Sequence, residues 1–295
     1  MNSRWFQRRL IPCCWIFCIG RSKICSLHLF PALFSQMTWR RSSKLPIPSP
    51  YASSLGEAWK AFVEETLMNS VRQSIPSRVI YRLIQVMLPF IIILTSVRLV
   101  LYTANVWVKI EYRLPGFPAD LYGFSLDDRI YWSSIDIDYL LTDAENNYFD
   151  EFTLDDDSPM HNDRELRHMQ DVKGLLETVW KVWGSGIFFL LALAAVLWWL
   201  DGRAVALRAV IAGSKLTILL MIFLVIFLLA AFGILFVGFH RIFFEGSTWL
   251  FPLSDTFIRL YPERFWRDIF ALLAGVTVLL SGLIGGVARW SLRAK

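Results

Sequence analysis

The sequence predicts an all-α polytopic membrane protein, with four transmembrane helices and amphipathic helices in its extracytoplasmic part. Two observations lead to this fold class. Of the 295 residues, 55% are apolar and the mean hydropathy is +0.46, so the chain can bury its apolar surface only with the help of lipid. The charged residues are also distributed unevenly, which is typical of a chain with loops on two sides of a membrane.

Four apolar segments are long enough to cross a bilayer, which takes about 20 helical residues. The first of them includes Arg98 near its end, where a long side chain can reach the headgroup layer. In the fourth, Gly282 and Gly286 have the spacing of a GxxxG helix contact, although a single match in an apolar run is weak evidence. The expected transmembrane helices are residues 77–102, 179–200, 216–239 and 268–288.

The charges between these segments predict the orientation of the chain. Between residues 103 and 181 lie 17 of the 25 acidic residues and only 7 Lys or Arg. The segments before the first span, between the second and third, and after the fourth are basic, and a Lys/Arg excess marks the cytoplasmic side. We therefore expect the cytoplasm to contain the N-terminus, the loop 201–215 and the C-terminal tail 289–295. The acidic loop 103–178 and the aromatic loop 240–267 are expected outside, and the net charge of +5 gives no case for nucleic-acid binding.

Residues 1–76 are expected to form an N-terminal extension. Three interpretations stay open: a start codon set upstream of a true start at Met68, a disordered extension, or a targeting segment. All four cysteines lie in this extension, without a partner His/Cys pair at zinc spacing, namely Cys13, Cys14, Cys18 and Cys25. The loops predicted to be extracytoplasmic contain no cysteine, which excludes a catalytic thiol there.

Local signals predict shorter elements in the acidic loop. Ser125 with Asp128, and Asn162 with Glu165, have the spacing of capping boxes. Each pair precedes apolar residues at helical steps, so we expect two amphipathic helices to begin there. Residues 106–113 alternate weakly between apolar and polar side chains and indicate a strand or an extended segment.

Two histidines beside predicted membrane boundaries are the candidate catalytic residues. His168 lies on the amphipathic helix that leads into the second span, and His240 follows the third span directly. Imidazole is the side chain most easily poised for proton transfer near neutral pH. Glu165 or Asp171, three residues away on either side, could orient His168. Each histidine taken singly is more often structural, but their shared setting strengthens the case for a functional pair.

Other chemistry has weaker support. His161, Glu165 and His168 line one helical face, but their spacing is not that of a known zinc motif and further ligands are missing. We therefore expect neither a metal nor a cofactor. Arg241 could bind a phosphate or carbonyl oxygen, although anchoring at the membrane interface is its ordinary role. The spans contain almost no ionisable residue, which disfavours ion transport.

Two stretches resemble a bacterial family of integral membrane proteins that includes the lipoprotein intramolecular transacylase Lit. They are ELRHMQDVK, residues 165–173, and FHRIFFEGSTWLFPLSDTFIRLYPERFW, residues 239–266. The resemblance extends from about Arg78 to Arg289 and includes YGFSLDDR in the first loop. The family histidines fall on His168 and His240, and Lys173 closes the first motif as a supporting residue.

The resemblance implies an enzyme of the bacterial cytoplasmic membrane. Its substrate would be the N-terminus of a diacylated lipoprotein, and its reaction would move the sn-2 acyl chain to the α-amine of the lipidated cysteine. Such a substrate brings its own nucleophile, so that two histidines suffice as general base and general acid. Which histidine plays which role stays open, as does the oxyanion donor, for which Arg241 and a protonated histidine are candidates.

A second function class remains as an alternative. A non-catalytic membrane protein could use its extracytoplasmic loops, above all the acidic loop, to bind a protein partner. The separation of the two imidazole rings discriminates between the classes. Rings more than roughly 10 Å apart could not share proton transfer without rearrangement.

Overall fold

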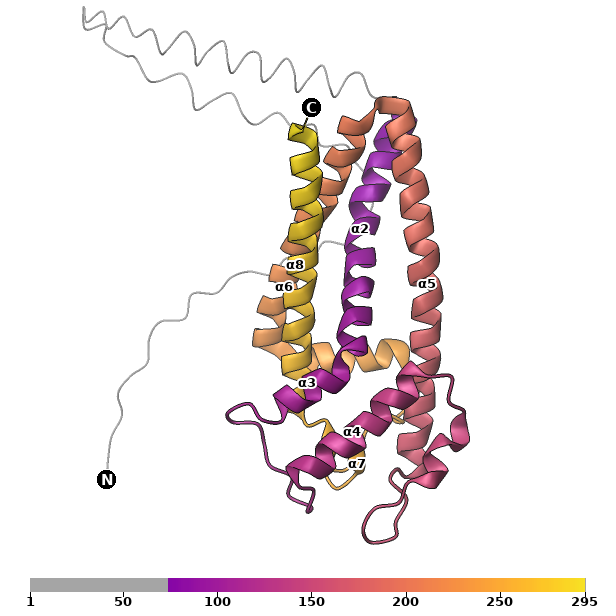
Figure 1. Ribbon diagram of the computed structural model, residues 1–295, viewed down its shortest axis with the longest axis vertical. Coiled ribbons are helices and arrows are strands. Elements are labelled where there is room, and N and C mark those ends of the chain that lie inside the picture. Colours follow the sequence, from indigo (N-terminus) through magenta and orange to yellow (C-terminus); the bar gives the residue numbers. More distant parts are fainter. Residues whose placement is uncertain (1–73, 295) are drawn as a thin grey trace, which may run out of the picture. The chain divides into compact units, whose positions relative to one another are not determined.

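The computed structural model describes residues 74–294, in which every regular element is helical. Four helices are long and apolar enough to cross a membrane: α2 (Ile75–Tyr102), α5 (Asp163–Asp201), α6 (Arg203–Phe243) and α8 (Glu263–Arg293). They confirm the predicted all-α membrane class with four spanning helices (Figure 1). The expectations for the cysteines and for Met68 lie outside the described residues.

The long helices bury small side chains against one another and expose large apolar ones. Phe188, Trp199 and Leu229 are 76%, 83% and 82% exposed, as expected for faces that meet lipid. The close contacts involve other glycines than the expected GxxxG pair. A Cβ on Gly213 would lie 2.9 Å from the Leu88 side chain, whereas one on Gly286 would meet nothing within 4 Å in the described part of the chain.

The segment expected as a cytoplasmic loop, 201–215, is helical instead. Only Gly202 separates α5 from α6, and its φ of +85° permits the abrupt reversal. After it, Ala206 and Ala209 are buried in a cluster with Ile84 and Leu197. The basic side chains of this segment are exposed on the outer face of a helix. Their charge therefore does not indicate a loop.

Helix α6 breaks before it reaches His240. Ala231 has φ −152° and ψ 46°, which is not helical. The residues after this break run across the end of the bundle toward α5 (Figure 1). The break falls beside the small residues Ala230 and Gly233, where a helix is easily bent. The break lies within the third span expected over residues 216–239, and the bend carries His240 sideways.

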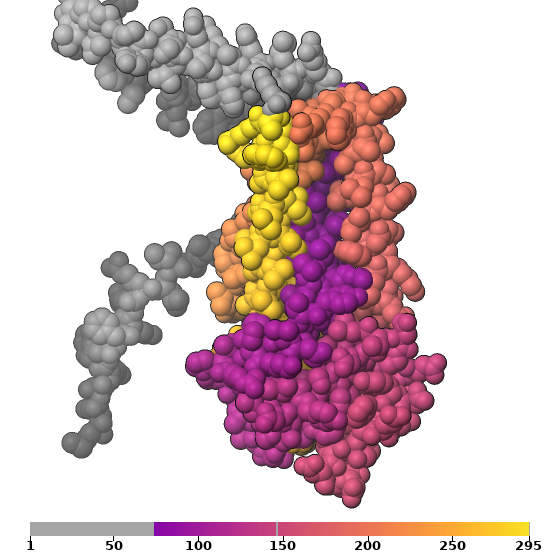
Figure 2. All heavy atoms as spheres, in the orientation of Figure 1, coloured from indigo at the N-terminus to yellow at the C-terminus, as the bar shows by residue number. Residues whose placement is uncertain are grey.

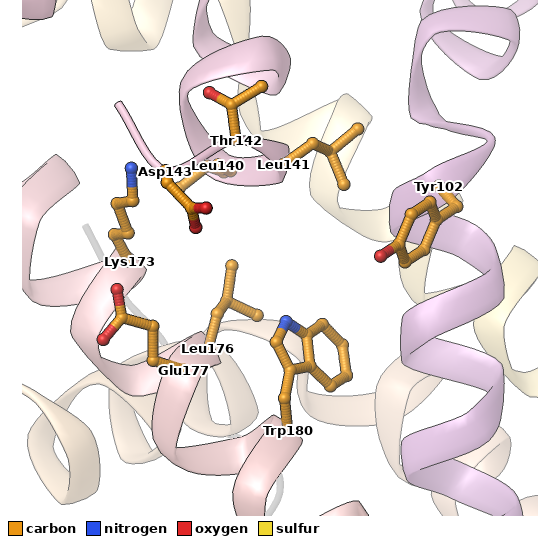
Figure 3. Close-up of a pocket in the computed structure, with 9 residues that line it drawn as sticks. All are labelled: Tyr102, Leu140, Leu141, Thr142, Asp143, Lys173, Leu176, Glu177 and Trp180. Carbon is orange, nitrogen blue, oxygen red and sulfur yellow. The ribbon is translucent and has the colours of Figure 1, made fainter. Parts of the chain in front are cut away.

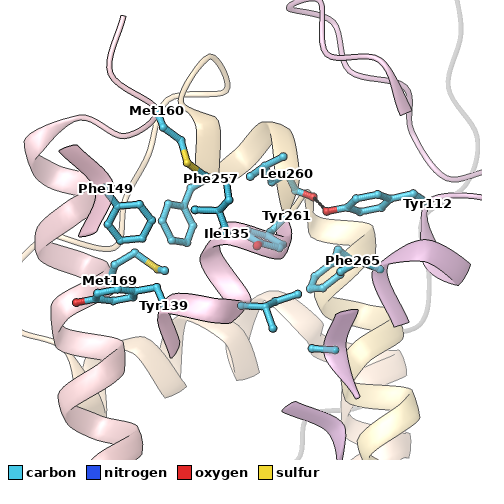
Figure 4. Close-up of a cluster of buried hydrophobic side chains, with 13 residues drawn as sticks. Tyr112, Ile135, Tyr139, Phe149, Met160, Met169, Phe257, Leu260, Tyr261 and Phe265 are labelled. Atoms are coloured by element: carbon cyan, nitrogen blue, oxygen red, sulfur yellow. Dashed lines mark hydrogen bonds between the residues drawn. The ribbon is translucent and has the colours of Figure 1, made fainter. Parts of the chain in front are cut away.

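Four short elements gather at the same end of the bundle and form, with their loops, what we call the cap. They are α3 (Ala104–Glu111), α4 (Leu126–Leu141), the 3-10 helix η1 (Asn146–Glu151) and α7 (Thr256–Leu260). On the face drawn in Figure 2, atoms of the cap form a continuous surface at this end. Buried aromatic and aliphatic side chains from α3, α4, α5, α7 and α8 form its core (Figure 4).

Both predicted capping boxes are confirmed, and the predicted strand is not. The Ser125 side chain accepts from the N–H of Asp128, and the Asn162 side chain accepts from the N–H of Glu165. Residues 106–113, expected to be extended, fall mostly in α3. A strand here would have no partner for its backbone, whereas a helix pairs its own polar groups and buries Val108 in the core of the cap.

Candidate active site

The two candidate histidines meet between α5 and the end of α6. The Asn162 cap starts α5, which places His168 on its second turn, and the bent segment of α6 places His240 beside it. Their ring centroids are 6.1 Å apart, with an interplanar angle of 22°. The side chains are almost buried, with residue exposures of 6% and 8%. This separation allows both rings to act on one substrate.

Aromatic side chains enclose this histidine pair. The ring of His168 lies 4.8 Å from Phe244, 5.4 Å from Phe251 and 5.7 Å from Phe257. The ring of His240 lies 4.2 Å from Phe236 and 5.0 Å from Trp249. Such an enclosure excludes water, which suits the transfer of an acyl group to an amine without hydrolysis.

Hydrogen bonding makes the two imidazoles different. Nδ1 of His240 donates to the carbonyl oxygen of Phe236 at 2.8 Å, so in the neutral ring Nε2 carries the free lone pair. Nδ1 of His168 is buried and has no partner within residues 74–294. His240 is therefore fixed in one tautomer, and His168 is held mainly by the packing of its ring.

Trp249 adds a polar group that the sequence did not single out. Its indole Nε1 is buried without a hydrogen-bond acceptor in the described chain, while its ring packs on His240. An unpaired indole N–H costs free energy, and it can donate to an oxygen of a bound substrate. The density of aromatic residues between 240 and 266 was the signal for this region, but an interfacial belt explained that density equally well.

Comparison with known proteins identifies the family. A family model described as "Lipoprotein intramolecular transacylase Lit" matches residues 82–266. The chain belongs to this family. An uncharacterised protein of Aquifex aeolicus (strain VF5) is 26% identical over 221 residues, which are 70% of this chain and 95% of the relative.

Solved structures of a Lit protein have the same fold. The membrane-integral Lit of Bacillus cereus, determined in meso, matches with a TM-score of 0.62 and 21% identity, over 75% of this chain and 98% of that one. A form of it with a histidine-to-alanine substitution matches with a TM-score of 0.54 and 18% identity, over 76% and 97%. The likeness supports the fold, and the family match makes this chain a membrane transacylase.

In this Lit-family protein, Glu165 does not orient His168. One of its carboxylate oxygens accepts from the backbone N–H of Phe257 at 2.7 Å, and the other accepts from the N–H of Asn162 at 2.9 Å. Glu165 thus ties α7 to the start of α5. Because the ring of Phe257 packs on His168, the carboxylate acts on the histidine pair only through the position of this ring.

His161 belongs to the core of the cap and not to the histidine pair. Its Nε2 lies 2.7 Å from Asp136, its Nδ1 lies 3.7 Å from Glu165, and the hydroxyl of Tyr261 donates to Asp136 at 3.0 Å. Burial lowers the pKa of His161, but the two carboxylates outweigh it and raise that pKa to about 9. No cluster of three or more metal-ligating side chains was found in residues 74–294.

The other supporting candidates lie outside the enclosure. Asp171 and Arg241 are exposed, so neither can act on a buried substrate atom without rearrangement. Lys173 donates from Nζ to the carbonyl oxygens of Tyr139 at 3.0 Å and Ala144 at 2.5 Å. These bonds hold the C-terminal end of α4 against α5. The motif around His168 therefore combines one candidate catalytic residue with residues that hold the cap in place.

Proposed function

We propose that this chain transfers the sn-2 acyl chain of a diacylglyceryl lipoprotein to the α-amine of the N-terminal cysteine of the same lipoprotein. The observation that carries the proposal is the enclosed histidine pair, with ring centroids 6.1 Å apart, in a chain of the Lit family. The alternative, a binding protein that uses its acidic loop, gives no reason for two imidazoles to converge in an aromatic enclosure.

The reaction needs proton transfer and positioning, and both reactants are present in one substrate. The amine nitrogen attacks the ester carbonyl carbon, a C–N bond forms, and the carbonyl electrons move to the oxygen. When the tetrahedral intermediate collapses, the bond between the carbonyl carbon and the glyceryl oxygen breaks. That oxygen takes up one proton and the amine loses one, so an ester becomes an amide and a free hydroxyl. Holding the amine and the ester together supplies most of the rate acceleration.

The hydrogen bond of His240 supports its assignment as the general base. With Nδ1–H held by Phe236, Nε2 accepts the proton of the attacking amine. His168 is then the acid that protonates the glyceryl oxygen, and one proton crosses between the rings in each turnover. Two imidazolium ions this close repel one another, so the pair works with a single proton.

Trp249 is the proposed donor to the oxyanion. Its unpaired indole N–H is buried beside His240, and a donor already in place is stronger than one that must leave water. Arg241, the earlier candidate for this role, is exposed. The donor is then neutral, which suits an apolar enclosure that must also admit an acyl chain.

The charge distribution supports an orientation in the cytoplasmic membrane of a bacterium. Acidic residues are concentrated between residues 103 and 181, which include three of the four short elements of the cap. The start of α6, which carries Arg203 and Arg208, lies at the opposite end of the bundle (Figure 1). By the positive-inside rule the cap and the histidine pair face away from the cytoplasm, and both termini face into it.

A reporter lipoprotein tests the function directly. The protein is expressed in a host that leaves lipoproteins diacylated, and the N-terminal lipopeptide is analysed by mass spectrometry. We expect a lyso-form, with an N-acyl group and one remaining glyceryl ester, that disappears in His168→Ala and His240→Ala. Arg167→Ala and Arg241→Ala are the matched controls, because these exposed side chains are the immediate chain neighbours of the two histidines. A lyso-form that survives both histidine substitutions would keep the activity and refute the site.

A further inference from the structure

A second site lies away from the histidine pair, where α2 ends between α4 and α5. It is a cavity of about 200 Å³. Its apolar walls come from Leu141, Leu176 and the rings of Tyr102 and Trp180. Asp143 directs its carboxylate into it, whereas the carboxylate of Glu177 lies on the side of Lys173 (Figure 3). Neither carboxylate forms an ion pair within 4.0 Å among the described residues.

The cavity lies where the bundle meets the cap, which is the level of lipid headgroups. Tyr102 is the last residue of α2, and Trp180 lies two residues before the apolar stretch of α5, which begins at Val182. Tyr and Trp favour this layer, because it accommodates both an apolar ring and a polar tip. A ligand of this cavity would therefore be in contact with the bilayer surface.

Arg98 lies behind the aromatic walls, one turn deeper in the membrane. Its guanidinium carbon is 5.2 Å from the ring centroid of Tyr102, 5.0 Å from that of Trp180 and 4.7 Å from that of Trp183. Cation–π contacts hold the group in place, but they do not neutralise it. Within residues 74–294, no carboxylate lies within 4.0 Å of Arg98, so its charge is available for an anion.

We propose that this cavity, together with Arg98 on its membrane side, binds the headgroup of a zwitterionic phospholipid of the ethanolamine type. The order of the groups from the membrane outward is a cation, two aromatic rings and then two carboxylates. A phospholipid of this type has the complementary order, with its phosphate nearer the acyl chains and its ammonium farther out. Arg98 binds the phosphate, and Asp143 with Glu177 binds the ammonium, whose methylene groups pack against Trp180.

The nearby lysine does not cancel this charge pattern. Lys173 also lines the cavity, but its ammonium is directed to two carbonyl oxygens and to the ring of Tyr139, 4.2 Å away. Its charge also acts on Asp143 and Glu177, but it is one cation against two carboxylates, so the outer end of the cavity keeps a net negative charge. A lipid bound there would bridge α2, α4 and α5 and so fasten the cap to the bundle.

Native mass spectrometry of the full-length protein in detergent tests the proposal, and it needs no altered protein in its first step. The probes are phosphatidylethanolamine and its N-acetylated form, with identical acyl chains. Both carry the phosphate, but only the first carries the ammonium. We expect the first to bind about fivefold more tightly, as two partly exposed ion pairs allow. Equal binding of the two lipids would overturn the proposal.

Variants then locate the binding. Asp143→Asn with Glu177→Gln should abolish the preference for the free ammonium and leave the acetylated lipid unaffected, whereas Arg98→Gln should weaken both lipids. Asp150→Asn with Glu151→Gln is the matched control, because it removes the same charge from two exposed residues that do not line the cavity. A preference that persists without Asp143 and Glu177, or that the control pair also abolishes, would refute the site.

Discussion

At the scale of single residues, the hydrogen bond from His240 to the carbonyl of Phe236 makes the two histidines chemically unequal. It fixes the free lone pair on Nε2, while His168 has no such anchor on Nδ1. An enzyme that needs one base and one acid gains from this inequality, since a pair of identical imidazoles could begin in the wrong protonation state. The assignment rests on geometry that no sequence pattern contains, because the bond joins a side chain to a carbonyl.

The role of Trp249 can be tested at the same scale. Trp249→Phe keeps an aromatic ring against His240 but removes the indole N–H. If that N–H binds the oxyanion, kcat should fall about 100-fold while KM stays nearly constant, because the donor acts mainly in the transition state. The measurement is the rate of lyso-form production from a purified diacylated lipopeptide.

Trp107 provides the control for this substitution. Its indole nitrogen is also buried without a partner in the described chain, but it packs against the core of the cap. Trp107→Phe should therefore leave kcat within about twofold of the parent protein. Equal losses in the two variants would show that Trp249 contributes packing and not an oxyanion hydrogen bond.

At the scale of elements, a buried ionic network joins three helices of the cap region. Asp136 belongs to α4, Glu165 to α5, and Tyr261 follows α7 directly, with His161 between the carboxylates. Removing one charged member of the network would leave an uncompensated buried charge, which strongly destabilises the folded state. The network therefore fixes the relative positions of the elements that carry His168 and its neighbour Phe257.

The network predicts a loss of cap stability at alkaline pH. The pKa of His161 in the folded protein is about 9, above its ordinary value of 6.5. Its stabilisation is thus complete below about pH 6.5 and is lost as the pH rises through about 9. The whole shift in the pKa of His161 corresponds to about 3 kcal/mol of unfolding free energy. The thermal midpoint should therefore fall by several degrees between pH 6.5 and 9.5.

His161→Asn separates this effect from general alkaline instability. The variant has no imidazole that can lose a proton between pH 6.5 and 9.5, so its thermal midpoint should be lower than that of the parent protein at pH 6.5 and nearly flat up to pH 9.5. The same fall with pH in both proteins would assign the titration to another group.

Some elements could be predicted from the sequence because their signals are local. The capping boxes at Ser125 and Asn162 span three residues each, and both start helices as expected. The partner of Glu165 could not be predicted, because Phe257 is 92 positions away along the chain. Residues 201–215 were misassigned because their basic side chains suggested a loop, although buried Ala206 and Ala209 were already spaced three apart.

At the scale of the whole molecule, the bundle determines where the histidine pair forms. His240 reaches α5 only because α6 breaks at Ala231 and crosses the end of the bundle. The position of α6 along its neighbours therefore sets the position of the bent segment. Near the opposite end of α6, Gly213 fixes this position by its close approach to Leu88 on α2.

This dependence predicts that a substitution far from the histidines impairs the reaction. Gly213→Val would place a side chain into Leu88, where a Cβ alone would already lie 2.9 Å from its atoms and 3.3 Å from a backbone oxygen. We expect a cost of about 2–3 kcal/mol in unfolding free energy and a clear loss of lyso-form production as α6 shifts.

Gly286→Val is the matched control, since its added atoms meet open space in the described part of the bundle. Thermal midpoints and reporter lipopeptides measured for both variants decide the matter. If Gly286→Val were as damaging as Gly213→Val, β-branching in an apolar helix would explain the loss, and the contact between α2 and α6 would not be what places His240.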